Sequence, residues 1–438
     1  MLCGMEEGCR KMRTYRELSR EELLSLKTDL EKEYEEAKRK GLKLDMSRGK
    51  PSIAQLDLAR GFFDVLTSES DMKDESGVDV RNYGGLDGIP EAKRLMADLM
   101  GVSADHVIVC GNASLFIMYD TISRSVTHGV MGSTPWCKLD KVKFLCPVPG
   151  YDRHFAITQH FGIEMINIPM TPQGPDMDMV ESLVSEDAGI KGIWCVPKYS
   201  NPQGYTYSDE TVRRFAALKP AAEDFRIYWD NAYAVHDLYD NGGDSLLEIF
   251  AECEKTGNVD MVFEFCSSSK ISLAGAGIAA VAASRANLDF MKKSMTIQTI
   301  GYDKVNQLRH ARYFKDINGI RKHMKRHAEL LRPKFEAVQE VLERELGGLG
   351  IGTWTKPNGG YFIAFEAMEG CAADIVARCK EAGVTLTGAG AAFPYGRDPK
   401  DSNIRIAPSF PTPEELAMAT DLFVLCVKLA SIEKLLQP

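Results

Sequence analysis

The chain lacks the features that mark membrane and secreted proteins. Its 438 residues contain no apolar run near the ~18 residues that suffice to span a bilayer. The N-terminal stretch MLCGMEEGCRKMRTYRELSREE is polar and has no apolar centre of the kind found in secretory signals. We therefore expect a cytoplasmic protein that does not bind a membrane.

The chain also lacks an excess of positive charge and the residue spacing that is typical of metal sites. The formal net charge is −9, which argues against nucleic acid as the main partner, because phosphate-backbone binding needs clustered Lys and Arg. The eight histidines show no H-E-x-x-H or similar spacing, so we expect no metal site. His323 and His327 stand four residues apart in a basic stretch, and we expect both on the surface. The 11 cysteines form no CxxC pair, which favours free thiols in a reducing compartment.

Short apolar runs alternate with helical stretches along the middle of the chain. They are rich in Val and Ile and are bounded by Gly, Pro or polar clusters: HVIVCG, KVKFLCPVPG, IEMINIPM, IKGIWCVP, FRIYWDNAY, VDMVFEFC and IAAVAAS. Such runs are typical of buried strands in a mostly parallel sheet covered by helices. They predict an α/β fold whose large domain has three layers.

The pattern changes after residue 318. INGIRKHMKRHAELLRPKFEAVQEVLEREL predicts one long helix, bent near Pro333. GLGIGTWTKPNGGYFIAFEA then predicts two strands of a smaller antiparallel sheet. We expect an N-terminal arm at 1–62 that forms part of the small domain, a large domain at 63–318, and the rest of a smaller α+β domain at 319–438.

Lys270 stands directly after an apolar strand, in FEFCSSSKISLAGAG, and before a turn of small residues. A lysine so placed is expected to face a cavity, where desolvation lowers its pKa and lets the amine attack an aldehyde to form an imine. Ser267 and Ser269 can donate hydroxyl hydrogens to a phosphate. The alternative is a helix-capping serine run with an incidental lysine.

Asp230 ends the preceding apolar strand, in RIYWDNAYAVHD, where an unpaired carboxylate is costly. In pyridoxal chemistry an aspartate keeps the pyridine nitrogen protonated, so that the ring can accept electrons. Tyr233, three residues further on, can reach the phenolic oxygen of that ring. Taken alone, D-x-A-Y is also common in turns and at helix starts.

Three weaker motifs offer groups of matching chemistry. Asn201, in the turn YSNPQG, can donate a hydrogen bond to the same phenolic oxygen. The backbone N–H groups of Asn112, Ala113 and Ser114, between a strand and a helix, form a natural phosphate cradle. Arg405, in the short strand of SNIRIAPSF, suits bidentate capture of an α-carboxylate. Each motif alone is also common in proteins without such a site.

As an ordered set, these motifs resemble the fold-type I pyridoxal-phosphate aminotransferases of class I/II. The shared segments are YGGLDGIPEAK, CGNAS, PVPGYDRHF, YSNPQG, DNAY, SSSK, GGYF and NIRIAPSF. The resemblance implies pyridoxal 5′-phosphate held by Lys270 and a homodimer with active sites at the subunit interface. It also implies that Gly49 lines the substrate site, that Tyr83 reaches the phosphate in the neighbouring subunit, and that Tyr151 stacks on the pyridine ring.

The chain departs from the commonest branch of that family at one place. The stretch ISLAGAGIAAV has no arginine where that branch carries a phosphate-binding one. The phosphate must then be held by serines, backbone N–H groups and some other cation. Together with SRGKPS and DKVNQLRHARYF, this pattern resembles the bacterial aspartate aminotransferase subgroup 1c.

The resemblance implies a ping-pong transamination, from L-aspartate to 2-oxoglutarate, in which Lys270 acts as general base and acid. An acidic substrate needs a second cation near its side-chain carboxylate. The candidates are Arg48, Lys50, Arg309 and Arg312, of which Arg48 and Arg309 are our first choices. Structural ion pairs are the alternative explanation for each of them.

Two other functions fit the same motifs. A pyridoxal-dependent C–S lyase or decarboxylase would use the same scaffold, because the fold does not fix the reaction. A non-catalytic ligand sensor would need an added DNA-binding helix-turn-helix module. The short segment before the first expected helix and the acidic charge both disfavour the sensor.

Overall fold

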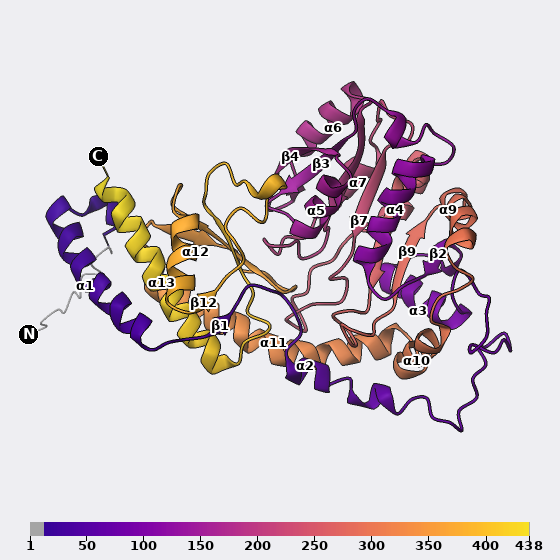
Figure 1. Cartoon of the computed structure of the whole chain (residues 1–438), viewed down its shortest axis with the longest axis horizontal. Helices are drawn as coiled ribbons and strands as arrows, with labels where there is room; N and C mark the ends of the chain where they lie inside the picture. Colours follow the sequence, from indigo (N-terminus) through magenta and orange to yellow (C-terminus); the bar gives the residue numbers. More distant parts are fainter. Residues whose placement is uncertain (1–12, 438) are drawn as a thin grey trace, which may run out of the picture.

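The computed structural model describes residues 13–437, which form two lobes joined by a long helix (Figure 1). The expectation about a secretory signal concerns the start of the chain, most of which lies outside the described residues. Within 13–437 no helix combines the length and the apolar character needed to cross a membrane.

The larger lobe is built on an eight-stranded sheet with the order β2-β9-β8-β7-β6-β3-β4-β5. Its strands are β2 Val107–Val109, β3 Lys143–Val148, β4 Glu164–Thr171, β5 Gly174–Pro175, β6 Ile190–Cys195, β7 Arg226–Asp230, β8 Val262–Ser267 and β9 Ala279–Ala283. Strands β4, β3, β6, β7 and β8 pair in parallel, whereas β2, β5 and β9 add antiparallel pairings. All seven apolar runs form strands, so the predicted α/β fold with a mostly parallel sheet is confirmed.

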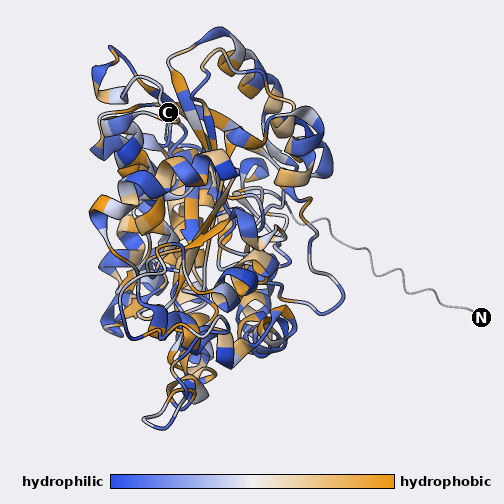
Figure 2. Cartoon of the chain, turned by 90° about the vertical axis from the view of Figure 1, so that its right-hand side faces the viewer, coloured by the Kyte–Doolittle hydropathy of each residue, from blue (hydrophilic) through white to orange (hydrophobic). Residues whose placement is uncertain are grey.

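Helices cover both faces of this sheet (Figure 1). They are α3 Pro90–Met100, α4 Ser114–His128, α5 Asp152–His160, α6 Met177–Glu186, α7 Asp209–Ala216, α8 Ile249–Thr256, α9 Arg285–Gln298 and α10 Lys304–Phe314. Side chains alternate between the faces along each strand: on β7, Ile227 and Trp229 join one apolar cluster, and Tyr228 joins the other. Apolar residues accordingly run along the central strands in Figure 2. The strands end in polar residues, and these residues can form a site at the edge of the sheet.

The smaller lobe combines the start and the end of the chain. Its antiparallel sheet has the order β10-β11-β13, and β1 pairs in parallel with β12. The elements are α1 Arg20–Arg39, β1 Leu44–Asp45, α2 Ile53–Asp57, β10 Gly352–Trp354, β11 Ile363–Ala367, α12 Ala372–Glu381, β12 Val384–Thr385, β13 Asn403–Ile406 and α13 Pro413–Leu436. Leu23 and Leu30 of α1 share one core with Phe423 and Val427 of α13. Short 3-10 helices complete the chain at Tyr15–Glu17, Arg60–Phe63, Ala104–His106, Trp136–Lys138, Val259–Met261 and Pro394–Gly396.

Helix α11, Ile317–Leu346, joins the two lobes and contains Pro333, as the sequence predicts. Its first half packs into the large core through Ile320 and Met324, and its second half packs into the small core through residues such as Leu331. The expectation that His323 and His327 lie on the surface is wrong, because these side chains are only 5% and 1% exposed. Both lie on the stripe of α11 that faces the interior of the protein.

Candidate active site

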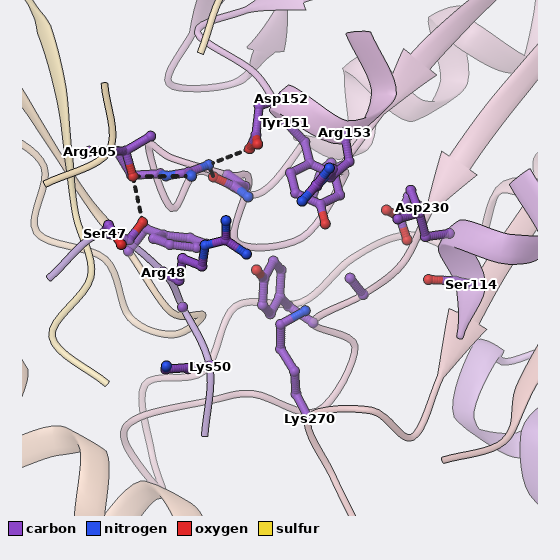
Figure 3. A pocket seen from close by; sticks show the side chains of 18 of the residues that line it. Ser47, Arg48, Lys50, Ser114, Tyr151, Asp152, Arg153, Asp230, Lys270 and Arg405 are labelled. Carbon is purple, nitrogen blue, oxygen red and sulfur yellow. Dashed lines mark hydrogen bonds and ion pairs between the residues drawn. The ribbon is translucent and has the colours of Figure 1, made fainter. Parts of the chain in front are cut away.

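A cavity of about 470 Å³ lies between the two lobes, beside the carboxyl ends of the parallel strands. The large lobe supplies Ser114, Tyr151, Asn201, Asp230, Tyr233, Ser267 and Lys270 to its lining, and the small lobe supplies Arg48, Gly49, Lys50, Phe362, Thr387 and Arg405. Ligands bind at this end of open α/β sheets because strand-to-helix turns place polar groups there. Figure 3 shows Lys270, Asp230 and Arg405 entering the cavity from different sides.

Lys270 follows β8, and its ammonium nitrogen lies 5.0 Å from the ring centroid of Tyr233. Burial lowers the pKa of Lys270, while the Asp230 carboxylate acts in the opposite direction. A lysine with a lowered pKa is more often the neutral amine at neutral pH. The structure therefore presents Lys270 in the environment of a nucleophile and proton carrier.

Asp230 ends β7 and is only 2% exposed. Its Oδ2 lies 3.0 Å from Nε2 of His154, whose ring stacks on Trp194 at a centroid distance of 4.4 Å. Its Oδ1 is buried and has no hydrogen-bond partner among residues 13–437. Because an unpaired buried carboxylate oxygen is costly, this atom calls for a donor bound in the cavity. A protonated pyridine nitrogen is a donor of that kind.

Arg405 is held on β13 by three side chains. Its Nη1 donates to Asp152 Oδ1 at 2.8 Å and to Asn201 Oδ1 at 3.2 Å, and its Nη2 donates to Thr387 Oγ1 at 3.2 Å. The guanidinium also lies over the Phe362 ring, 4.9 Å from the centroid. Asn201 accepts through its oxygen here, so its amide nitrogen stays available as the donor that the sequence predicts.

The expected phosphate cradle lies at the start of α4. Ser114 is its first residue, Ala113 is the N-cap, and Ser114 and Ser267 both line the cavity. Ser267 Oγ donates to Ser269 Oγ at 3.1 Å, and Ser269 Oγ donates to the Asn112 carbonyl at 3.4 Å. The serine run after β8 is thereby tied to the N-terminus of α4, beside the cavity, where aligned N–H groups favour an anion.

Tyr151 and Gly49 both line the cavity, as expected. The Tyr151 ring meets the His154 ring edge-on at 4.9 Å, and burial raises the pKa of Tyr151 to about 12. A Cβ at position 49 would lie 2.5 Å from the Phe362 ring, so only glycine fits there without rearrangement.

Six of the expected site residues do not line the cavity of their own chain: Asn112, Ala113 and Ser269 of the expected phosphate cradle, and Tyr83, Arg309 and Arg312. Tyr83 is 81% exposed. The guanidinium of Arg309 lies 5.5 Å from the Phe62 ring centroid, and Arg312 donates to the Lys73 carbonyl at 3.3 Å. Of the four candidate cations, the structure brings Arg48 and Lys50 to the cavity.

Sequence reasoning missed three consecutive residues in the first turn of α5. Asp152 pairs with Arg405, and Arg153 lines the cavity (Figure 3). His154 pairs with Asp230. The signal was present in PVPGYDRHF, where three titratable side chains follow a strand and a Pro-Gly turn. Only the tyrosine of that segment was considered.

Comparison with known proteins identifies the family. The family model described as aspartate amino-transferase matches residues 18–438. The chain belongs to this family. It is 47% identical to an aspartate aminotransferase of Corynebacterium glutamicum, over 92% of this chain and 93% of the relative. The predicted family and the predicted aminotransferase class of enzyme are confirmed.

Solved structures agree with this assignment. An aspartate transaminase from Corynebacterium glutamicum superposes with a TM-score of 0.94 at 45% identity, covering 96% of this chain and 99% of that one. LysN, an α-aminoadipate aminotransferase of Thermus thermophilus solved with N-(5′-phosphopyridoxyl)-L-leucine, shares the fold at a TM-score of 0.70 and 19% identity, covering 90% of this chain and 93% of that one.

Proposed function

We propose that this enzyme transfers the amino group of L-aspartate to 2-oxoglutarate, with pyridoxal 5′-phosphate bound at Lys270. The observation that carries the proposal is the orphaned Oδ1 of Asp230, in the same cavity as a lysine whose pKa is lowered by burial. When bound, the cofactor supplies an aldehyde that takes up the amino group and a ring that accepts electrons.

The protein residues then have separate tasks. Asp230 keeps a proton on the ring nitrogen, and His154 holds the carboxylate in place. The Lys270 amine takes the proton from the substrate α-carbon and returns it at the cofactor, as general base and then general acid. Tyr233 and the amide nitrogen of Asn201 are the proposed donors to the phenolic oxygen. The stacking role of Tyr151 is likewise a proposal.

The phosphate end of the site is proposed at the start of α4. Ser114 and Ser267 would hold the phosphate with their hydroxyls, and the aligned backbone N–H groups of the helix start would add to its binding. Ser269 supports this arrangement through its hydrogen bond to the Asn112 carbonyl.

The charge of the cavity supports a dicarboxylic substrate. Five basic residues line it against two acidic ones: Arg48, Lys50, Arg153, Lys270 and Arg405 against Asp152 and Asp230. Arg405 is proposed to bind the α-carboxylate, sharing its guanidinium with Asp152. Arg48 is our candidate for the side-chain carboxylate, and Arg153, on the facing helix, is the alternative.

We also propose that the enzyme works as a homodimer in the cytoplasm. Several large apolar side chains are exposed on the single chain, among them Phe63 at 63%, Tyr83 at 81% and Ile297 at 88%. Burial of such side chains between two copies would be favourable. A partner copy is also the proposed route by which Tyr83 reaches a phosphate.

A panel of amino acids tests the proposed reaction. Each amino acid is added to the holoenzyme, and conversion of the bound cofactor to its amine form is followed by absorbance. We expect aspartate and glutamate to respond, and 2-oxoglutarate to reverse the change. Release of pyruvate and ammonia without reversal would instead identify a lyase. A Lys270→Ala protein that kept the absorbance of the lysine–cofactor imine would refute the role of Lys270.

A further inference from the structure

A cluster of buried polar side chains lies outside the cavity lining and contacts the backbone one residue after Lys270. It comprises His323 and His327 of α11, Gln55 of α2, and Tyr361, all at most 5% exposed. The two imidazole rings lie 4.8 Å apart, with their Nε2 atoms 3.1 Å apart. The proposed reaction assigns none of these residues a role, although buried polar side chains are retained only when they are satisfied.

The amide of Gln55 fixes the hydrogen positions in this cluster. Its Oε1 accepts from the backbone N–H of Ser52 at 3.0 Å, so its Nε2 must be the end that faces His327. This nitrogen lies 2.9 Å from the Tyr361 hydroxyl oxygen and 3.2 Å from His327 Nδ1. His327 Nδ1 is therefore an acceptor, and the neutral ring carries its hydrogen on Nε2.

The His323 ring faces the peptide bond that follows Ile271, the residue after Lys270. The Ile271 carbonyl oxygen lies 2.9 Å from His323 Nε2, and since a carbonyl only accepts, this nitrogen is a donor. Burial lowers the pKa of His327 to about 3. Burial also lowers the pKa of His323. Both rings are thus neutral at neutral pH, and His323 Nε2 donates to the Ile271 carbonyl.

We propose that His323 is a positioning residue, which holds the Ile271 carbonyl and thereby fixes where the side chain of Lys270 enters the cavity. Because His323 projects from α11, which packs into both cores, it also ties the placement of the lysine to the helix that joins the lobes. The inference rests on the proposed role of Lys270. Errors of about 1 Å in such placement can cost on the order of 100-fold in rate.

The test compares His323→Leu with His323→Gln in the holoenzyme. Leucine fills much of the space without a donor, whereas the glutamine amide nitrogen can replace Nε2. For His323→Leu we expect kcat to fall about tenfold, KM for the amino acid to stay within about twofold, and the pH midpoint of the lysine–cofactor absorbance to shift. His323→Gln should recover most of the kcat and reverse most of the shift in the absorbance midpoint. His106→Leu is the matched control, since His106 Nδ1 also lies 3.0 Å from a carbonyl oxygen, that of Ala283, outside the cavity.

Unchanged kcat and absorbance midpoint in a folded His323→Leu protein would overturn the proposal. Equal losses in the Leu and Gln variants would also overturn it, because packing alone would then explain them. If His323→Leu does not fold, His323→Ala, which also lacks the donor, takes its place; a normal absorbance midpoint in that folded variant would overturn the proposal. A wild-type protein without any lysine–cofactor absorbance would instead refute the proposed function itself.

Discussion

Gly49→Ala is expected to weaken substrate binding by displacing the Phe362 ring or the segment that carries Gly49. The added Cβ would lie 2.5 Å from Cζ and 2.8 Å from Cε1 of Phe362, about 1 Å inside an ordinary contact. Phe362 is only 6% exposed, so the ring cannot simply turn into solvent. Overpacking of this kind costs about 1–3 kcal/mol.

That strain must displace one of two substrate-binding groups. If the ring moves, Arg405 loses the aromatic face that lies 4.9 Å from its guanidinium. If the glycine segment moves instead, Arg48 moves with it. A loss of about 2 kcal/mol corresponds to a rise of about 30-fold in KM, with a smaller change in kcat.

Steady-state kinetics with aspartate and alanine distinguish the two displacements. Ring movement should raise KM for both amino acids, whereas movement of Arg48 should raise KM for aspartate alone. Gly242→Ala is the control, because its Cβ would meet the nearest atom, on Tyr239, at an ordinary 3.5 Å. An unchanged KM for both amino acids in Gly49→Ala, with unchanged thermal stability, would refute the reasoning.

Three further changes have defined outcomes. Asp230→Asn should retain cofactor but lose at least about 100-fold in kcat, because a charged hydrogen bond worth about 3 kcal/mol is lost; single-turnover absorbance checks this, and a near-normal rate would contradict it. Arg405→Lys should raise KM for every amino acid about 100-fold, as steady-state kinetics would show, and an unchanged KM would exclude Arg405 from carboxylate binding. Burial raises the pKa of Glu264 to about 8, so the folded state holds this proton more tightly than the unfolded state. The contribution of Glu264 to the free energy of unfolding is complete below the usual carboxyl range and is lost as pH rises toward 8. Urea unfolding at pH 6 and pH 9 should therefore show that the free energy of unfolding of Glu264→Gln rises relative to the wild type at pH 9. An equal difference between the two proteins at both pH values would refute this prediction.

The strands and the main site residues could be predicted because they rest on local patterns. A buried parallel strand is a short apolar run, and the residue that follows it lies at the carboxyl edge of the sheet. Asp230, Asn201 and Lys270 each come at or shortly after the end of such a run, and all three line one cavity. Their chain order was therefore enough to place them together.

The partners of these residues could not be predicted, because they depend on distances in space and not in sequence. His154 meets Asp230 across 76 residues, and Asp152 meets Arg405 across 253. No local pattern encodes which helix turn packs against which strand end. A single chain does not bring Tyr83 or Arg309 to the cavity. The role of Tyr83 was expected from the resemblance, and that of Arg309 from the need of an acidic substrate for a second cation.

The prediction that the α11 histidines lie on the surface was wrong for a different reason, and this reason can be recognised from the sequence alone. Their neighbours in the chain are basic, but burial in a helix follows a period of 3.6 residues and not adjacency. Ile320, His323, Met324, His327 and Leu331 recur at that period and form one buried stripe. A polar side chain on an otherwise apolar stripe must find a partner inside the protein, and the partner here is the carbonyl beside Lys270. The same periodicity that assigns a helix to the core therefore points to interior histidines as candidates for a role in positioning the site.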